Sequence, residues 1–155
     1  MKTIIALFAL LLIITAGIYF SQNYLKNNPF TFNQNKEITI GKQTFKVAVA
    51  KTNEEKQVGL SKKTSLADNE GMLFSFEKED FYSFWMKNMK IPIDIIYINK
   101  NKIITIYSDI KPPKDANENL LVIYKPEEPS DSVLEIKAGL SKKYGFEKGD
   151  EVKVK

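Results

Sequence analysis

The chain has 155 residues and a formal net charge of +4, and it contains neither cysteine nor histidine. The lack of cysteine excludes disulfides, thiol nucleophiles and thiolate zinc sites, and the lack of histidine excludes Ser–His and Cys–His relays. Catalysis would depend on carboxylates, lysine, tyrosine or a hard cation, and we expect no cofactor and no metal site. The basic excess is mild and dispersed, so nucleic acid is not an expected partner.

The first 20 residues form a hydrophobic segment, in which Lys2 precedes an apolar run from Ile4 to Phe20. This pattern is typical of a signal peptide or an uncleaved signal anchor, and the run reaches the lower length limit for a transmembrane helix. Cleavage after Gly17 would give a secreted or periplasmic domain. We favour the anchor because the apolar run continues past that position. Lys2 would then face the cytoplasm, and the domain would lie outside it as part of a bacterial envelope.

Residues 21–36 are rich in Asn and Gln, as expected of a linker, and residues 37–155 are expected to form a single domain. Glu37–Ile40 and Phe45–Val49 alternate around a Gly-Lys turn, which predicts a hairpin. Thr52–Glu55 has the form of a capping box, which predicts a short helix that ends near Gly59.

The middle of the chain predicts further strands. Met72–Phe76 is strand-like, and Glu77–Asp80 is expected to be a charged turn. Phe81–Asn88 is the densest aromatic stretch, and both of its faces would be largely apolar, which predicts a central strand covered on both sides. Asp94–Ile98 and Lys102–Tyr107 flank an Asn-Lys-Asn turn and predict a second hairpin.

The C-terminal part continues the same pattern. The expected elements are a loop over Lys111–Asn119, strands over Leu120–Tyr124 and Val133–Ile136, a helix over Ala138–Tyr144 that ends at Gly145, and a last strand over Val152–Val154. Many short strands with frequent turns predict a mainly β (α+β) fold, a small β-barrel or sandwich-like domain with two short helices after the N-terminal hydrophobic helix.

Several short motifs occur in a fixed order. They are Thr52-Asn53-Glu54-Glu55 with Gly59-Leu60, Gly71-Met72-Leu73-Phe74, Phe84-Trp85-Met86-Lys87-Asn88, Ile91-Pro92-Ile93-Asp94, Val133-Leu134-Glu135 with Ala138-Gly139, and Gly149-Asp150. In this order they resemble the domain-of-unknown-function 192 family, also called uncharacterised protein family 0127, over about Lys46 to Val154. Met89 and Ser61 depart from the family pattern, which usually has Thr and Met there. The resemblance implies a compact β-rich fold, often behind a signal or anchor, and no established activity.

Trp85, Lys87, Asn88 and Asp94 are the leading candidates for a ligand site. Trp85 and Lys87 would share a strand face, and Pro92 could set a bend that brings Asp94 near them. An indole ring supplies contact area and the polar groups fix orientation, as in sites for sugars and other polar ligands. The alternative is a packed core tryptophan with a structural ion pair between Lys87 and Asp94.

Glu135 is a further candidate, because it lies among apolar neighbours. It could oppose Asp94 as the acid/base pair that acts on glycosidic bonds, although alternation along the strand would place it outward. Three functions follow in order of preference. They are a non-catalytic binding module for a small polar ligand, glycan or envelope protein, a pure structural scaffold, and a carboxylate-based hydrolase or lyase acting on envelope glycans.

Overall fold

The computed structural model describes residues 15, 19, 34–114 and 121–155. The expected N-terminal helix and most of the linker lie outside the described residues, and within the described part of the chain no helix is long and apolar enough to cross a membrane. The remaining elements belong to the unit of residues 32–155. They are β1 (Gln34–Ile40), β2 (Gln43–Ala50), α2 (Asn53–Val58), β3 (Glu70–Asp80), β4 (Phe84–Trp85), β5 (Ile93–Asn99), β6 (Lys102–Ile110), β7 (Ile123–Tyr124), β8 (Ser130–Lys137), α3 (Leu140–Tyr144) and β9 (Val152–Val154). The predicted mainly β fold with two short helices is confirmed.

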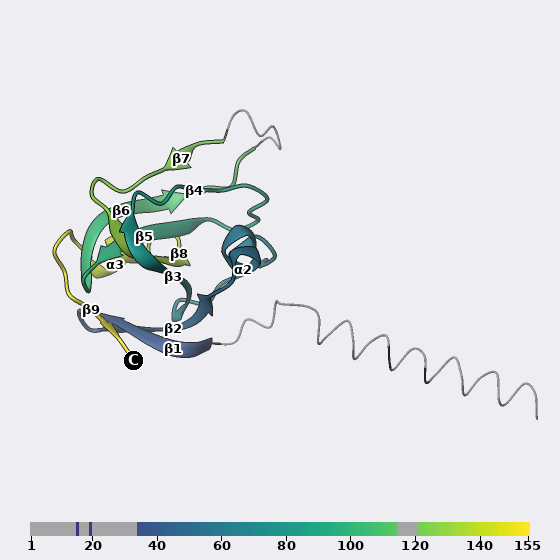
Figure 1. Cartoon of the computed structure of the whole chain (residues 1–155), viewed down its shortest axis with the longest axis horizontal. Coiled ribbons are helices and arrows are strands. Elements are labelled where there is room, and N and C mark those ends of the chain that lie inside the picture. Colours follow the sequence, from purple (N-terminus) through teal and green to yellow (C-terminus); the bar gives the residue numbers. More distant parts are fainter. Residues whose placement is uncertain (1–14, 16–18, 20–33, 115–120) are drawn as a thin grey trace, which may run out of the picture. The chain divides into compact units, whose positions relative to one another are not determined.

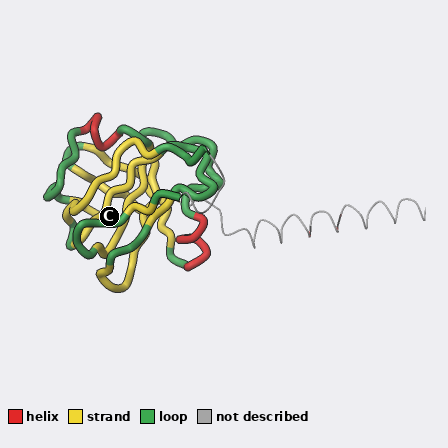
Figure 2. Tube along the Cα trace, turned by 90° about the horizontal axis from the view of Figure 1, so that it is seen from above, coloured by secondary structure: helices red, strands yellow, loops and turns green. Residues whose placement is uncertain are grey.

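Seven strands form one curled sheet in the order β6-β5-β8-β3-β2-β1-β9 (Figure 1). Only β2 and β3 run parallel among these neighbours, and α2 lies in the crossover that such a pair requires. At the two edges, Lys102 of β6 forms an isolated bridge with Glu151, the residue before β9. Beside it, the Ile103 amide donates to the Asp150 carbonyl over 3.0 Å. The sheet therefore curls into a barrel-like shape, with the two helices at separate places around the strands (Figure 2).

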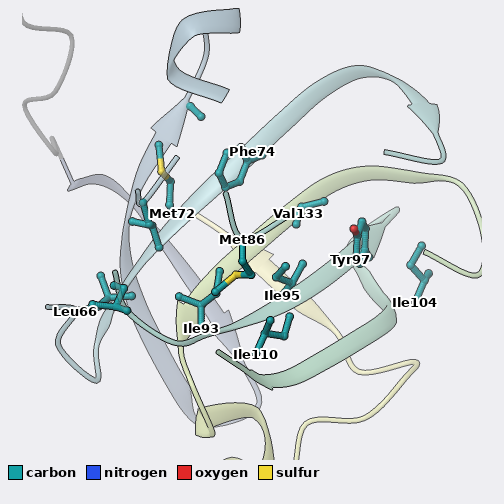
Figure 3. Packing of buried hydrophobic residues seen from close by; sticks show 13 residues of the cluster. Leu66, Met72, Phe74, Met86, Ile93, Ile95, Tyr97, Ile104, Ile110 and Val133 are labelled. Carbon is teal, nitrogen blue, oxygen red and sulfur yellow. The ribbon is translucent and has the colours of Figure 1, made fainter. Parts of the chain in front are cut away.

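Side chains alternate between the two faces along each strand. The inner face is buried, and the outer face is buried over the middle strands, whereas Glu37, Lys46 and Lys153 are exposed on the outer face towards the β9 edge. The inner face encloses a cluster to which all seven strands and α3 contribute: Ile38, Ile40, Phe45, Val47, Leu73, Ile96, Ile98, Ile103, Leu134, Ile136, Leu140 and Val152. The outer face carries a second cluster, which includes Met72, Phe74, Ile95, Tyr97 and Val133 (Figure 3). Met86 comes from the segment that follows β4 and packs into this outer cluster.

The aromatic stretch Phe81–Asn88 is not the central strand that its pattern predicts. Only Phe84 and Trp85 are in strand conformation, as β4, and they pair with β7 in a separate two-stranded sheet. The central position between β3 and β5 is taken by β8. The aromatic stretch is left to cover the outer face of the main sheet, where Phe84 packs against the outer cluster.

The residues Glu77–Asp80 are also not a turn, because β3 continues through them. A register shift separates the Ser75–Ser132 pair from the Asp80–Ser130 pair on β8, so the strand passes the charged residues with an irregular ladder. Alternation and charge alone do not reveal this, because a β-bulge disrupts pairing locally without ending a strand.

The sequence signals that predict the start of α2, the end of α3 and the turn of the second hairpin are confirmed. The Thr52 capping box is present, and Gly145 ends α3 in the left-handed conformation with a φ of 67°. The second hairpin turns at Lys100 and Asn101, which have φ angles of 48° and 61°. These positive angles match the right-handed twist of the flanking strands in a two-residue hairpin turn.

Candidate functional site

A pocket of about 280 Å³ lies on the outer face of the main sheet. It is bounded by α2 and the turn after it, by the outer face of β3 and β8, and by the chain around β4. The lining residues are Asn53, Lys56, Gln57, Val58, Gly59, Leu60, Phe74, Phe76, Tyr82, Ser83, Phe84, Trp85, Lys87, Met89 and Glu135. This volume is at the small end for ligand sites, so it suits a molecule built around about one ring.

The helix α2 is fixed at its first turn by the capping box. Thr52 Oγ1 accepts a hydrogen bond from the Glu55 amide over 3.1 Å, and Glu55 Oε2 accepts from the Thr52 amide over 2.9 Å and from the Lys51 amide over 2.6 Å. These amide donors hold the pKa of Glu55 below its ordinary value. Glu55 therefore supports one wall of the pocket without lining it.

Gly59 ends α2 in a backbone conformation reserved for glycine, with φ of 48° and ψ of −132°. A Cβ at this position would lie 3.2 Å from Phe74 Cζ and 3.8 Å from Glu135 Oε2. The absence of a side chain here lets the backbone pass close to Phe74 and keeps the space beside the Glu135 carboxyl group open.

Aromatic rings form most of the remaining wall. Phe76 and Tyr82 stack with ring centroids 3.5 Å apart, and Phe74 meets Phe84 edge to face at 4.9 Å. The Lys56 ammonium lies 4.7 Å from the centroid of the Phe76 ring, within the range of a cation–π contact. The wall therefore combines flat apolar surfaces with a positive charge.

Glu135 places a carboxyl group at the base of this pocket. Its side chain is 5% exposed, and Oε2 has no hydrogen-bond partner among the described residues. Met72 of β3 and Ile95 of β5 are its cross-strand partners, so its sheet neighbours on both sides are apolar. Burial raises the pKa of Glu135 to about 8, since a charged carboxylate is disfavoured away from water. At neutral pH this group is mostly a neutral acid that can donate a hydrogen bond.

The structure brings three of the five predicted site residues together. Trp85, Lys87 and Glu135 all line the pocket, and Trp85 is 44% exposed. Asn88 is exposed, has a φ of 59°, and is not among the lining residues. Asp94 is fully buried and also does not line the pocket.

Asp94 instead ties α3 to the barrel. Its carboxylate accepts hydrogen bonds from the Asp109 amide at 2.7 Å, from the Gly139 amide at 2.8 Å, and from the Ser141 amide and hydroxyl at 2.8 Å and 2.6 Å. These four donors account for a buried carboxylate without any ligand.

The two carboxylates Asp94 and Glu135 lie on opposite faces of the sheet. Asp94 pairs with Ile136 in the ladder between β5 and β8, and paired residues share a face, whereas Glu135 is the next residue along β8. Two groups on opposite faces cannot flank one glycosidic bond, so the predicted acid/base pair is not formed.

The family profile of DUF192, described as Uncharacterized ACR, matches residues 36–154. The chain belongs to this family. The match covers every strand and helix of the DUF192 domain that contributes to the pocket. No curated protein matches the chain.

Two solved structures resemble this DUF192 domain. A protein of unknown function from Novosphingobium aromaticivorans DSM 12444 is 31% identical with a TM-score of 0.68, and the match covers 76% of this chain and 83% of that one. A protein of Sinorhizobium meliloti 1021, provisionally named a transcription regulator, is 30% identical with a TM-score of 0.67, and the match covers 78% of this chain and 95% of that one.

Sequence reasoning missed most of the lining of the DUF192 pocket. The sequence pattern predicts Phe74, Phe76 and Tyr82 only as strand residues, and Gly59 only as the end of a helix. The available signals were the unusual aromatic density up to Trp85 and the glycine that follows a capped helix. Neither signal indicates a pocket by itself, because only the register of β3 and β8 brings the aromatic residues and the glycine over Glu135.

Proposed function

We propose that this DUF192 domain is a non-catalytic binding module that takes a small polar ligand in the pocket beside α2. The observation that carries the proposal is that Glu135 Oε2, at the base of an aromatic-walled pocket, has no hydrogen-bond partner within the described ranges 34–114 and 121–155. A buried polar atom without a partner costs folding free energy, and a ligand that satisfies it recovers that cost. A few polar groups in a mostly apolar pocket are the usual composition of a small-molecule site.

Two further observations favour binding over the other two functions. The indole of Trp85 is 44% exposed at the pocket, whereas a pure scaffold would bury its one tryptophan in the core. The separation of Asp94 and Glu135 by the sheet removes the acid/base pair on which the hydrolase or lyase depended. A glycan remains a candidate ligand for a binding module, because an aromatic plate beside polar groups suits a sugar ring.

We also propose that the hydrophobic N-terminal segment holds the domain at the outer side of a membrane. The support for this is the apolar run from Ile4 to Phe20 after Lys2. Fractionation of cells that express the full chain, with and without residues 4–20, tests it. Recovery of the intact chain in the soluble cytoplasmic fraction would contradict the proposal.

Ligand-observed NMR on the full chain in a non-ionic detergent tests the binding function. The probes are monocyclic carboxylates, amides, amines and monosaccharides, which fit the pocket volume. We expect at least one class to bind and Trp85→Ala to weaken its binding by tenfold or more. Phe81→Ala is the matched control, because Phe81 is 52% exposed and does not line the pocket. Equal binding by both variants would count against this pocket.

A further inference from the structure

The charges around the Glu135 carboxyl group define what the pocket can accept. Lys56 and the polar residues Asn53 and Gln57 of α2 line one side of the pocket. Tyr82 and Lys87, from the segment around β4, also line it. On β5, Tyr97 lies on the same face, and its hydroxyl donates to the Tyr124 carbonyl over 2.8 Å. Burial, and then the neighbouring Tyr107 and Glu135, raise the pKa of Tyr97, so it stays neutral.

At neutral pH the lining therefore carries two positive charges, on Lys56 and Lys87, and a mostly neutral acid at its base. No ion pair joins Glu135 to a lysine among the described residues, which fits its low exposure and raised pKa. The protonated carboxyl group can donate a hydrogen bond, and its Oε2 atom has no partner in the part of the chain that the structure describes.

We infer that the pocket takes a small organic carboxylate with a flat apolar body, and that protonated Glu135 donates a hydrogen bond to the carboxylate of this ligand. The inference rests on the proposed binding function and names the ligand class. The positive lysines favour an anion. A hydrogen bond from a neutral acid to a carboxylate is short and strong because the acceptor is charged. The stacked and edge-on rings of Phe74, Phe76 and Tyr82 fit a flat body.

An organic cation fits the same pocket less well. An ammonium ligand would require Glu135 to lose its proton, and it would lie in a pocket lined by Lys56 and Lys87. The two ligand types also predict opposite pH dependence. Binding that needs the protonated acid weakens as the pH rises above about 8, while binding that needs the carboxylate strengthens up to that pH and then levels off.

Three probes with the same ring separate these cases: phenylacetate, phenylacetamide and phenethylamine. The chain has one tryptophan, so quenching of Trp85 emission reports binding at the pocket, and the Gly59 amide signal in a proton–nitrogen NMR spectrum gives a second local readout. The full chain in a non-ionic detergent is titrated with each probe between pH 6.5 and 9.5. We expect phenylacetate to bind most tightly, with affinity that is constant below about pH 8 and falls about tenfold per pH unit above it.

Glu135→Gln provides the decisive variant, because the glutamine amide still donates a hydrogen bond but does not titrate. We expect it to bind phenylacetate within a few-fold of the unmodified chain and to lose the decrease above pH 8. Glu54→Gln is the matched control, since Glu54 is exposed on α2 and does not line the pocket. It should keep the full pH dependence.

Each remaining outcome overturns the inference. Tighter binding of phenethylamine or phenylacetamide than of phenylacetate, with both local signals responding, refutes the ligand class and leaves the binding function standing. Phenylacetate affinity that does not change with pH refutes the donor role of Glu135. If none of the three probes affects Trp85 emission or the Gly59 signal, the ligand class is refuted. Monosaccharides titrated with the same two readouts then test the binding function separately, and their failure as well refutes binding at this pocket.

Discussion

Replacement of Glu135 by glutamine should stabilise the domain, and the gain should grow with pH. The substitution removes the ionisable group from the base of the pocket and nearly preserves the shape of the side chain. In the unfolded chain this carboxyl group titrates near 4.5, and in the folded domain burial raises its pKa to about 8. Between these two values the folded state holds a proton that the unfolded state has released.

The sign follows from this difference in bound protons. The folded state binds more protons than the unfolded state, so the free energy of unfolding decreases as the pH rises from 4.5 to about 8 and is constant beyond it. The slope approaches about 1.4 kcal/mol per pH unit, and the full loss is on the order of 5 kcal/mol. The glutamine variant lacks this loss. Its advantage over the unmodified chain should therefore grow by roughly 2 to 3 kcal/mol between pH 5.5 and 7.5.

Urea unfolding of the full chain at pH 5.5, 6.5 and 7.5, followed by Trp85 emission, measures this advantage. The quantity of interest is the difference between the variant and the unmodified chain at each pH, because contributions from the rest of the chain cancel in it. Glu54→Gln should follow the unmodified chain at all three values. Parallel stability profiles for Glu135→Gln and the unmodified chain would refute the reasoning, because they would mean that the acid ionises normally in the folded domain.

Three further substitutions test the architecture around the pocket. Asp94→Asn should lower the free energy of unfolding by about 3 kcal/mol, because four hydrogen bonds to a buried carboxylate are weakened, yet it should leave Trp85 emission unchanged at low urea. Gly59→Ala should cost about 1 to 3 kcal/mol through its positive φ and should weaken probe binding, since the new methyl group approaches Phe74; unchanged binding in a titration would contradict this. Thr52→Ala should cost about 1 kcal/mol in urea unfolding through loss of the capping box, and an unchanged midpoint would show that α2 does not need it.

The features that the sequence predicts correctly depend on residues close together in the chain. The capping box of Thr52, the end of α3 at Gly145 and the turn at Lys100 each rest on a local mechanism that acts over a few residues. Local interactions of this kind do not depend on which strands pair with each other in the sheet.

The features that the sequence predicts incorrectly depend on which strand takes which place in the sheet. Phe81–Asn88 has the composition of a central strand, but β8 occupies the central position and leaves the aromatic residues as a cover. Strict alternation would place Glu135 in solvent on a half-exposed strand. It is buried because β8 is covered on both faces. Asp94 was expected near Trp85, and the register of β5 directs it to the other side of the sheet.

The division of the sheet into an enclosed inner cluster and a covered outer cluster separates the residues that close the barrel from those that form the pocket. Ile136 and Leu134 belong to the first set, while Glu135 between them belongs to the second. Changes in the pocket thus need no matching change inside the barrel. Members of this family can therefore differ in the residues that line the pocket while they retain a common scaffold.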